Sequence, residues 1–204
     1  MHKIPMQEGN LLIHSGDATF QGRPQELEFF SAALKEWIPN FDKIIFVPGN
    51  HDILFQSNPG LARSLIPEDV VVLVDEAYQY DKYLIYGTPW TSYWLNYCWA
   101  FQCPAPELKK VWEKVPESTD ILITHNPPYL LGDKVGNRME GCPRLRERLE
   151  DEEDTRFNKV KLHVFGHIHE SYGVYGFGQG RIAVNASSCN ESCQAVNAPV
   201  IVNI

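Results

Sequence analysis

The sequence lacks an excess of basic residues and any long apolar run. Its 204 residues contain 18 Lys and Arg against 26 Asp and Glu, which gives a formal net charge of -8. Proteins that bind nucleic-acid polymers or anionic membranes neutralise phosphates with clustered Lys and Arg. No run approaches the ~18–20 apolar residues of a membrane span. We therefore expect neither a nucleic-acid polymer nor a membrane as partner, whereas a small phosphorylated substrate stays possible because bound cations can supply positive charge.

The cysteines also lack the spacing of a structural zinc site. Cys98 and Cys103 form one close pair and Cys189 and Cys193 another, and neither pair has C-x-x-C spacing. The cysteine count of 5 is odd, and no apolar stretch of signal-peptide type precedes them. Reduced thiols in a cytoplasmic protein are the simplest interpretation.

The chain does contain four short apolar runs that lead into residues able to bind a metal. These are Leu11-Leu12-Ile13 before Gly16-Asp17, Ile44-Ile45-Phe46-Val47 before Gly49-Asn50-His51-Asp52, Ile121-Leu122-Ile123 before His125, and Leu162-His163-Val164-Phe165 before Gly166-His167-Ile168-His169. Such runs, stopped by Pro or Gly, are typical of buried strands. In an open α/β sheet the carboxyl ends of the strands form one edge, where ligands collect. The pattern predicts a metal site at that edge.

The length suits one domain over residues 1–204, or one with a small subdomain, and allows a substantial core. Apolar residues at three- and four-residue spacing predict a helix over 24–38 between strands at 11–15 and 43–47, as in a parallel pair with a right-handed crossover. We expect strands over 70–74 and 83–86, joined by a hairpin-like connection. Helices are predicted over 61–66, 107–114 and 144–154, and strands over 121–124 and 161–165.

The last third of the chain changes in pattern. Short β-like segments over 172–177, 181–185 and 200–204 predict antiparallel strands in a second sheet. Together these elements predict an α/β fold in which two β-sheets pack face to face as a sandwich, flanked by helices.

Residues 87–105 are the most aromatic part of the chain, with Trp90, Trp94, Tyr97, Trp99 and Phe101 among them. One interpretation is a loop or short helix that packs against the body of the protein. The other is a wall of the active-site cleft that stacks on a base or an aryl group. The sequence favours the first but leaves both open.

The polar residues at the strand ends suit transition metals. Asp17 offers a carboxylate able to bridge two cations, Asn50 a carbonyl oxygen, and His125, His167 and His169 imidazole nitrogens. This mixed set fits Mn, Fe or Zn and does not fit an all-oxygen calcium cage. Two such ions can clamp a phosphoryl group and activate a water for in-line attack.

Two further residues of the second motif have catalytic chemistry available. His51 could donate a proton to a leaving oxygen or stabilise charge on a phosphate. Asp52 could orient that imidazole, as carboxylates beside metal sites often do.

The ordered set GD, GNHD, a His after an apolar strand, and GHxH resembles the calcineurin-like metallophosphoesterase superfamily. Longer stretches resemble its metallophosphoesterase-domain-containing subgroup, namely Lys3-Ile4-Pro5-Met6, GNHDILF at 49–55, THNPP at 124–128 and Val184-Asn185-Ala186-Ser187. The resemblance implies a four-layer fold with a dinuclear metal centre.

Carried over by position, Asp17 bridges the two metals and His169 binds the first. Asn50, His125 and His167 complete the second metal site. His51 is the catalytic histidine near the leaving group, and Asn126 is a candidate substrate contact.

One departure from the family pattern affects the first metal site. The family opens with a strand that ends in D-x-H, and no D-x-H precedes Gly16-Asp17 here. We expect this chain to be N-terminally truncated, through a gene-model error, a late start site or fragmentation. An inactive isoform is the weaker alternative. The first metal site then retains Asp17 and His169, and the first strand of the fold is missing.

The leading hypothesis is a metal-dependent phosphoesterase, and within that class a phosphodiesterase that acts on small or cyclic nucleotides. The first alternative is a catalytically impaired module that binds one metal and a nucleotide. The second is a protein Ser/Thr phosphatase of the same superfamily, which the short chain and the scarcity of Arg near the motifs disfavour.

Overall fold

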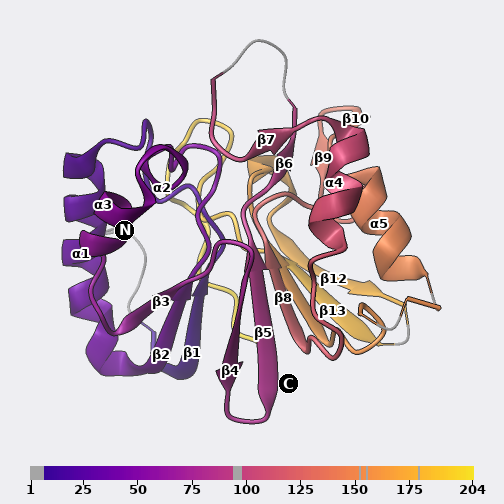
Figure 1. Cartoon of the computed structure of the whole chain (residues 1–204), viewed down its shortest axis with the longest axis horizontal. Coiled ribbons are helices and arrows are strands. Elements are labelled where there is room, and N and C mark those ends of the chain that lie inside the picture. Colours follow the sequence, from indigo (N-terminus) through magenta and orange to yellow (C-terminus); the bar gives the residue numbers. More distant parts are fainter. Residues whose placement is uncertain (1–6, 94–97, 152, 155, 179) are drawn as a thin grey trace.

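The chain folds into four layers, two helical and two of β-sheet (Figure 1). The computed structural model describes residues 7–93, 98–151, 153–154, 156–178 and 180–204. On one side lie α1 (Pro24–Trp37) and α3 (Pro59–Ser64), and on the other α4 (Ala105–Trp112) and α5 (Pro143–Glu150). Two sheets lie between these helical layers, which confirms the predicted α/β sandwich.

The first sheet is parallel and has the order β1-β2-β3. Its strands are β1 (Gly9–His14), β2 (Phe41–Phe46) and β3 (Val70–Val72). The predicted crossover helix α1 connects β1 to β2. Pro24 occupies its first turn, and the Glu26 carboxylate accepts hydrogen bonds from the backbone N–H groups of Gln21 and Arg23. These groups fix where the helix begins.

Within the described residues, the second sheet has six strands in the order β12-β13-β11-β8-β5-β4. They are β4 (Glu76–Tyr80), β5 (Tyr83–Thr88), β8 (Ile121–Thr124), β11 (Leu162–Phe165), β12 (Gly173–Phe177) and β13 (Arg181–Asn185). The four inner strands run parallel to one another, and β4 and β12 pair antiparallel at the two edges.

Three local predictions need correction. Segment 75–82 is more than a connection, because it contains β4, which pairs with β5, while β3 belongs to the other sheet. The strands β12 and β13 extend the sheet that contains β8 and β11 and do not form one of their own. Residues 200–204 form no strand. Val200 and Val202 pack against the core between the sheets, so their alternation reflects burial without strand pairing.

The remaining elements are short. A small hairpin lies in the 129–143 region, and a one-turn helix follows the GNHD motif. These elements are η1 (Ile38–Asn40), α2 (Leu54–Ser57), β6 (Thr91–Ser92), β7 (Gln102–Cys103), β9 (Lys134–Val135), β10 (Arg138–Met139) and η2 (His169–Ser171).

Apolar side chains form one core at each of the three layer boundaries. Along β8, Ile121 and Ile123 face the core between the sheets, while Leu122 faces the core under α4 and α5. Along β2, Ile45 faces the core between the sheets and Ile44 the core under α1. Because both faces of these strands are buried, their sequences read as unbroken apolar runs.

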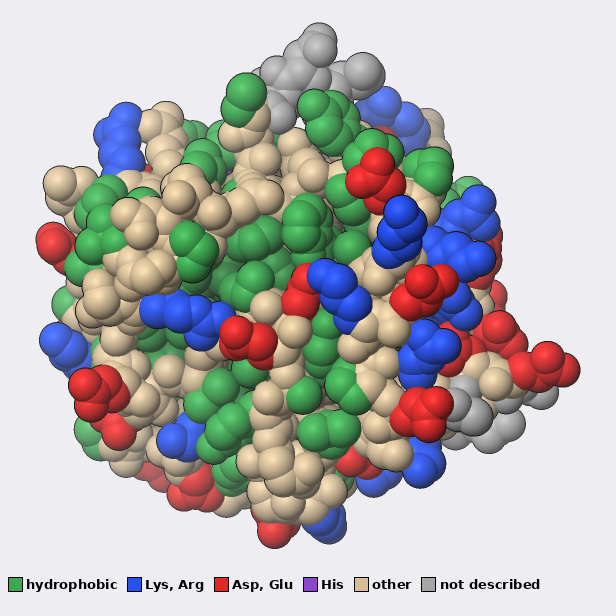
Figure 2. Space-filling model, in the orientation of Figure 1, with side chains coloured by type: hydrophobic (Ala, Val, Ile, Leu, Met, Phe, Trp, Pro, Cys, Tyr) green, Lys and Arg blue, Asp and Glu red, His purple; other side chains and the backbone are tan. Residues whose placement is uncertain are grey.

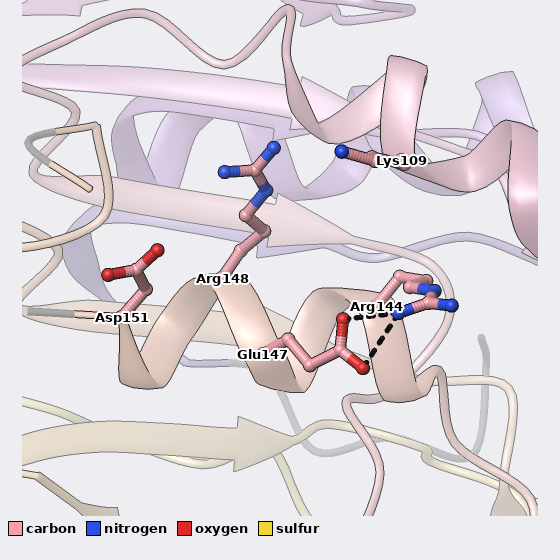
Figure 3. Close-up of a pocket in the computed structure, with 5 residues that line it drawn as sticks. All are labelled: Lys109, Arg144, Glu147, Arg148 and Asp151. Carbon is pink, nitrogen blue, oxygen red and sulfur yellow. Dashed lines mark hydrogen bonds and ion pairs between the residues drawn. The ribbon is translucent and has the colours of Figure 1, made fainter. Parts of the chain in front are cut away.

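The outer surface over α4 and α5 is charged but balanced. Figure 2 shows Lys and Arg interspersed with Asp and Glu on this side of the molecule. A hollow of about 230 Å³ lies here, lined by Lys109, Arg144, Glu147, Arg148 and Asp151 (Figure 3). Arg144 pairs with Glu147 at 2.7 Å and Arg148 with Asp154 at 3.0 Å. Both arginines are therefore neutralised by carboxylates of the same chain.

None of the helices in the described part of the chain combines the length and apolar character that crossing a bilayer requires.

Candidate metal centre

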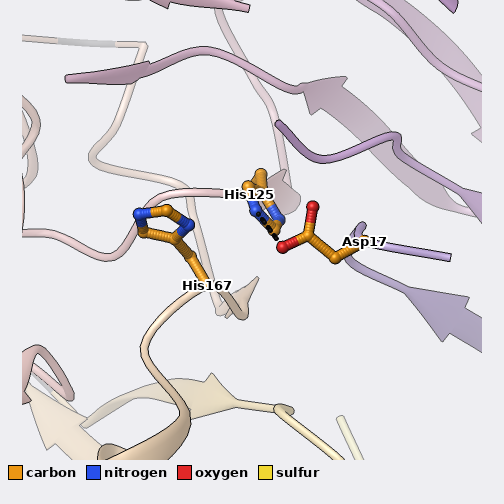
Figure 4. Close-up of side chains that lie close together, drawn as sticks. All are labelled: Asp17, His125 and His167. Atoms are coloured by element: carbon orange, nitrogen blue, oxygen red, sulfur yellow. Dashed lines mark ion pairs between the residues drawn. The ribbon is translucent and has the colours of Figure 1, made fainter. Parts of the chain in front are cut away.

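Three of the predicted ligands converge between the two sheets. The ligand atoms of Asp17, His125 and His167 all lie within 4.8 Å of one another (Figure 4). Asp17 follows β1 in the first sheet, whereas His125 and His167 follow β8 and β11 in the second. The site therefore joins strand ends from two facing sheets and not the edge of a single open sheet.

Asn50 joins the same group from the loop after β2. Its Oδ1 lies 3.0 Å from Nε2 of His125, and Oδ2 of Asp17 lies 3.2 Å from that same nitrogen. Nδ1 of His125 lies 2.8 Å from the carbonyl oxygen of Ser15. A carbonyl only accepts, so Nδ1 carries a proton and Nε2 faces the site, as is usual for metal-binding histidines.

The charges around these side chains favour a cation. Burial raises the pKa of Asp17, but His125 outweighs it and holds that pKa well below its usual range. Burial lowers the pKa of His167 to about 3, so its imidazole is neutral at pH 7. Burial also lowers the pKa of His125, but the Asp17 carboxylate reverses this and leaves it raised. A cation bound here would take the place of a proton on Nε2 of His125 beside the Asp17 carboxylate.

Two glycines allow the strand ends to approach. A Cβ on Gly49 would lie 2.2 Å from Oδ1 of Asp17 and 2.6 Å from Cε1 of His125. A Cβ on Gly16 would lie 2.4 Å from Nδ1 of His125. Asp17 and His167 themselves have positive φ angles of 56° and 67°. Non-glycine residues in this region cluster at functional sites, where the surroundings hold them.

Asp52 does not orient His51, and that part of the sequence-based prediction is wrong. The Asp52 carboxylate is fully buried and accepts hydrogen bonds from the backbone N–H groups of Gly49 at 2.7 Å and Thr19 at 2.9 Å. It also accepts the Thr19 hydroxyl at 2.8 Å and a longer bond from the Ala18 N–H at 3.3 Å. Burial, reinforced by Asp17, raises its pKa to about 6. Asp52 thus connects the loop after β1 to the loop after β2.

A backbone carbonyl orients His51 instead. Nδ1 of His51 lies 2.8 Å from the carbonyl oxygen of Phe20, so this nitrogen donates and Nε2 remains for a substrate. The His51 backbone N–H donates to Oδ1 of Asp17 at 2.9 Å, which places the residue against the metal centre. Its ring also contacts Phe20 and Trp99. The catalytic role of His51 remains a prediction, and this geometry is compatible with it.

The aromatic segment divides between the two interpretations offered for it. Trp90 and Phe101 meet edge to face at 5.9 Å and pack into the cores, as the packing interpretation expects. Trp99 instead lies against His51, with ring centroids 4.1 Å apart. Trp94 and Tyr97 lie outside the described residues, as do Lys3-Ile4-Pro5-Met6.

The two other predicted site residues are not members of the three-ligand group. Nδ1 of His169 donates to the carbonyl oxygen of Asn190 at 2.9 Å, and His169 is not among the three side chains that converge. Asn126 is 1% exposed, and its Nδ2 has no hydrogen-bond partner among the described residues. Its burial gives no support to a direct contact with substrate, so this assignment stays a prediction.

The donor set fits a first-row transition metal. Carboxylate, amide oxygen and two imidazoles from Asp17, Asn50, His125 and His167 form one mixed N/O site, as Mn, Fe or Zn accepts. For the first metal of the family pair, the sequence supplies Asp17 and His169.

Comparison with known proteins gives the same assignment. The family model described as calcineurin-like phosphoesterase matches residues 1–171. Metallophosphoesterase domain-containing protein 1 of Homo sapiens is 33% identical over 98% of this chain and 66% of its own length. UPF0046 protein K07C11.7 of Caenorhabditis elegans is 29% identical over 98% of this chain and 70% of its own length. The chain thus spans slightly less than two thirds of the human relative. The resemblance inferred from the motifs is confirmed: the chain belongs to the calcineurin-like phosphoesterase family.

Proposed function

We propose that this chain is a metal-dependent phosphodiesterase that hydrolyses small or cyclic nucleotides. The observation that carries the proposal is the convergence of Asp17, Asn50 and His125 on one point, with Nε2 of His125 3.0 Å from the Asn50 oxygen and 3.2 Å from the Asp17 oxygen. A divalent cation held there, with His167, supplies Lewis acidity toward a phosphoryl oxygen and lowers the pKa of a water molecule.

The protein groups have separable roles in this proposal. Asp17, Asn50, His125 and His167 hold the cation, and the backbone N–H of His51 fixes the second oxygen of Asp17 at 2.9 Å. The protonated Nδ1 of His51 donates a hydrogen bond to the Phe20 carbonyl, so its Nε2 is the nitrogen that contacts the substrate. When protonated, that nitrogen donates to the leaving oxygen or stabilises charge on the phosphate. Asp52 acts as a positioning residue through the loops that it joins.

Hydrolysis of bis(4-nitrophenyl) phosphate and of 2′,3′-cyclic AMP with added Mn²⁺ tests the proposal. We expect both diesters to be cleaved faster than 4-nitrophenyl phosphate. His51→Gln should lower kcat by about 10²–10⁴, the usual contribution of general acid catalysis, while Mn²⁺ affinity measured by calorimetry stays near that of the wild type. Binding of Mn²⁺ without turnover of any mono- or diester would overturn the enzyme assignment. Faster release of phosphate from phosphopeptides than from diesters would instead identify a protein phosphatase.

A non-catalytic module with one metal is the second candidate. The observation that favours it is that no D-x-H precedes Gly16-Asp17 in this sequence, so only Asp17 and His169 of the family's first-site ligands are present. Counting metals per chain by elemental analysis separates the two proposals. Two ions per chain would contradict the single-metal module, and one ion without turnover would support it.

A further inference from the structure

An exposed aromatic ring lies beside the candidate catalytic histidine. Phe20 is 62% exposed, and its ring stacks on that of His51 with centroids 5.8 Å apart and an interplanar angle of 29°. The Phe20 backbone carbonyl already accepts the His51 proton at 2.8 Å, a task that any residue could perform. The phenyl ring is not needed for that bond, and it belongs to none of the three cores.

A second ring reaches the same histidine from the aromatic segment. Trp99 is partly buried, and its ring centroid lies 4.1 Å from that of His51. Its neighbours anchor it, because the Ala100 N–H donates to the Asn50 carbonyl at 2.9 Å and the Phe101 N–H donates to Oε1 of Gln56, also at 2.9 Å. Ala100 and Phe101 are 1% and 3% exposed. The loop is therefore tied to the metal-binding motif, and it presents Trp99 beside His51.

We infer that Phe20 and Trp99 form a stacking site for an aromatic ring on the substrate, such as a nucleobase or an aryl group. The inference rests on the proposed function and names the substrate class that this site takes. His51 touches both rings, and its Nε2 faces the leaving oxygen in that proposal. A group attached to the leaving oxygen would therefore come within reach of the rings of Phe20 and Trp99. Because stacking uses the π-face that every base has, the site selects for an aromatic ring and discriminates little between bases.

Two substrates that share their reacting group provide the test. 2′,3′-Cyclic AMP and glycerol 1,2-cyclic phosphate both contain a five-membered cyclic phosphodiester, and only the nucleotide carries a base. The quantity measured is the ratio of their kcat/KM values. Since intrinsic reactivity cancels when this ratio is compared between variants, a change in the ratio reports contacts with the base.

We expect Phe20→Leu and Trp99→Leu each to reduce this ratio about tenfold, mainly by raising KM for the nucleotide. A tenfold change corresponds to ~1.4 kcal/mol of stacking free energy. Trp99→Phe keeps a ring and should retain most of the preference. Phe29→Leu is the matched control, because Phe29 is 61% exposed on α1, outside the first sheet, and its substitution should leave the ratio unchanged. Circular dichroism checks that each variant is folded.

An unchanged ratio in both leucine variants would overturn the stacking site while leaving the phosphodiesterase proposal intact. If the wild type cleaves neither substrate, the proposed function fails, and binding decides the stacking site separately. Calorimetry with Mn²⁺ then compares phenyl phosphate with methyl phosphate. A preference for the phenyl ester that both leucine variants lose supports the stacking site, and equal affinities contradict it.

Discussion

Substituting Gly49 by alanine tests the geometry of the metal centre with the smallest chemical change. The added Cβ would lie 2.2 Å from Oδ1 of Asp17, 2.5 Å from its backbone nitrogen and 2.6 Å from Cε1 of His125. Real Cβ contacts stay beyond 3.0 Å, so Asp17 or His125 must move by several tenths of an ångström. His125 is 0% exposed, and its Nδ1 is held by the Ser15 carbonyl. Oδ1 of Asp17 is held by the His51 backbone N–H. Neither side chain can therefore move easily.

Two losses follow from that displacement. Overpacking a buried site costs about 1–3 kcal/mol of unfolding free energy. Displaced ligands lower metal affinity, and perturbing the groups that orient ligands typically costs about 10–100-fold. We therefore expect Gly49→Ala to lose about 2 kcal/mol in urea unfolding without metal, and at least tenfold in Mn²⁺ affinity by calorimetry.

Gly60→Ala is the control for this prediction. It makes the same change in α3, where a Cβ would meet nothing within 4 Å. Because alanine is favoured over glycine in a helix by roughly 0.5–1 kcal/mol, its stability should stay equal or rise slightly. If Gly49→Ala bound Mn²⁺ with the wild-type Kd and unfolded at the wild-type urea concentration, the close approach of β1, β2 and β8 at this site would be refuted.

Three further predictions concern the surroundings of the site. Asp52→Ala and Asp133→Ala each remove a buried carboxylate that accepts hydrogen bonds from at least two backbone N–H groups. Each variant should therefore lose about 2 kcal/mol of unfolding free energy, measured in urea. Only the Asp52 variant should also lose Mn²⁺ affinity. Burial lowers the pKa of His163 from 6.5 to about 3, so stability should fall as pH drops from 6.5 toward 3, because the unfolded chain takes up the proton first. His163→Leu should flatten that fall in thermal melts from pH 7 to pH 4. His167→Ala should lower Mn²⁺ affinity more than His169→Ala, since only His167 belongs to the three-ligand group, and an equal loss would argue against that assignment.

The sequence was sufficient to predict the α/β sandwich and three side chains that converge in it. Runs such as Ile44 to Val47 are apolar at every position because β2 has helix α1 on one face and the second sheet on the other. This continuity marks a buried strand without saying which sheet it joins. The prediction therefore placed Asp17, His125 and His167 at strand ends, while their convergence between two facing sheets required the three-dimensional structure.

The assignment of Asp52 failed for a different reason. Asp52 follows His51 directly in the chain, and a carboxylate beside a histidine is a familiar orienting pair. In the structure the two side chains diverge, because the Asp52 carboxylate turns toward the backbone N–H groups of Gly49 and Thr19. Thr19 lies 33 residues away in the chain, and no local pattern indicates this contact. Adjacency in sequence was a poor guide to which groups share a hydrogen bond.

Main-chain carbonyls orient the histidines, and for this reason their orientation could not be predicted from the sequence. Each of three site imidazoles places Nδ1 against a backbone oxygen and so leaves Nε2 for a metal or a substrate. The pairs are His125 with Ser15, His51 with Phe20, and His169 with Asn190. Every residue carries a carbonyl, so the side chains at 15, 20 and 190 are free to serve other purposes without disturbing these bonds. At position 20 this freedom allows a phenyl ring to stand exposed beside His51, where it can select substrates while the backbone beneath it orients the imidazole.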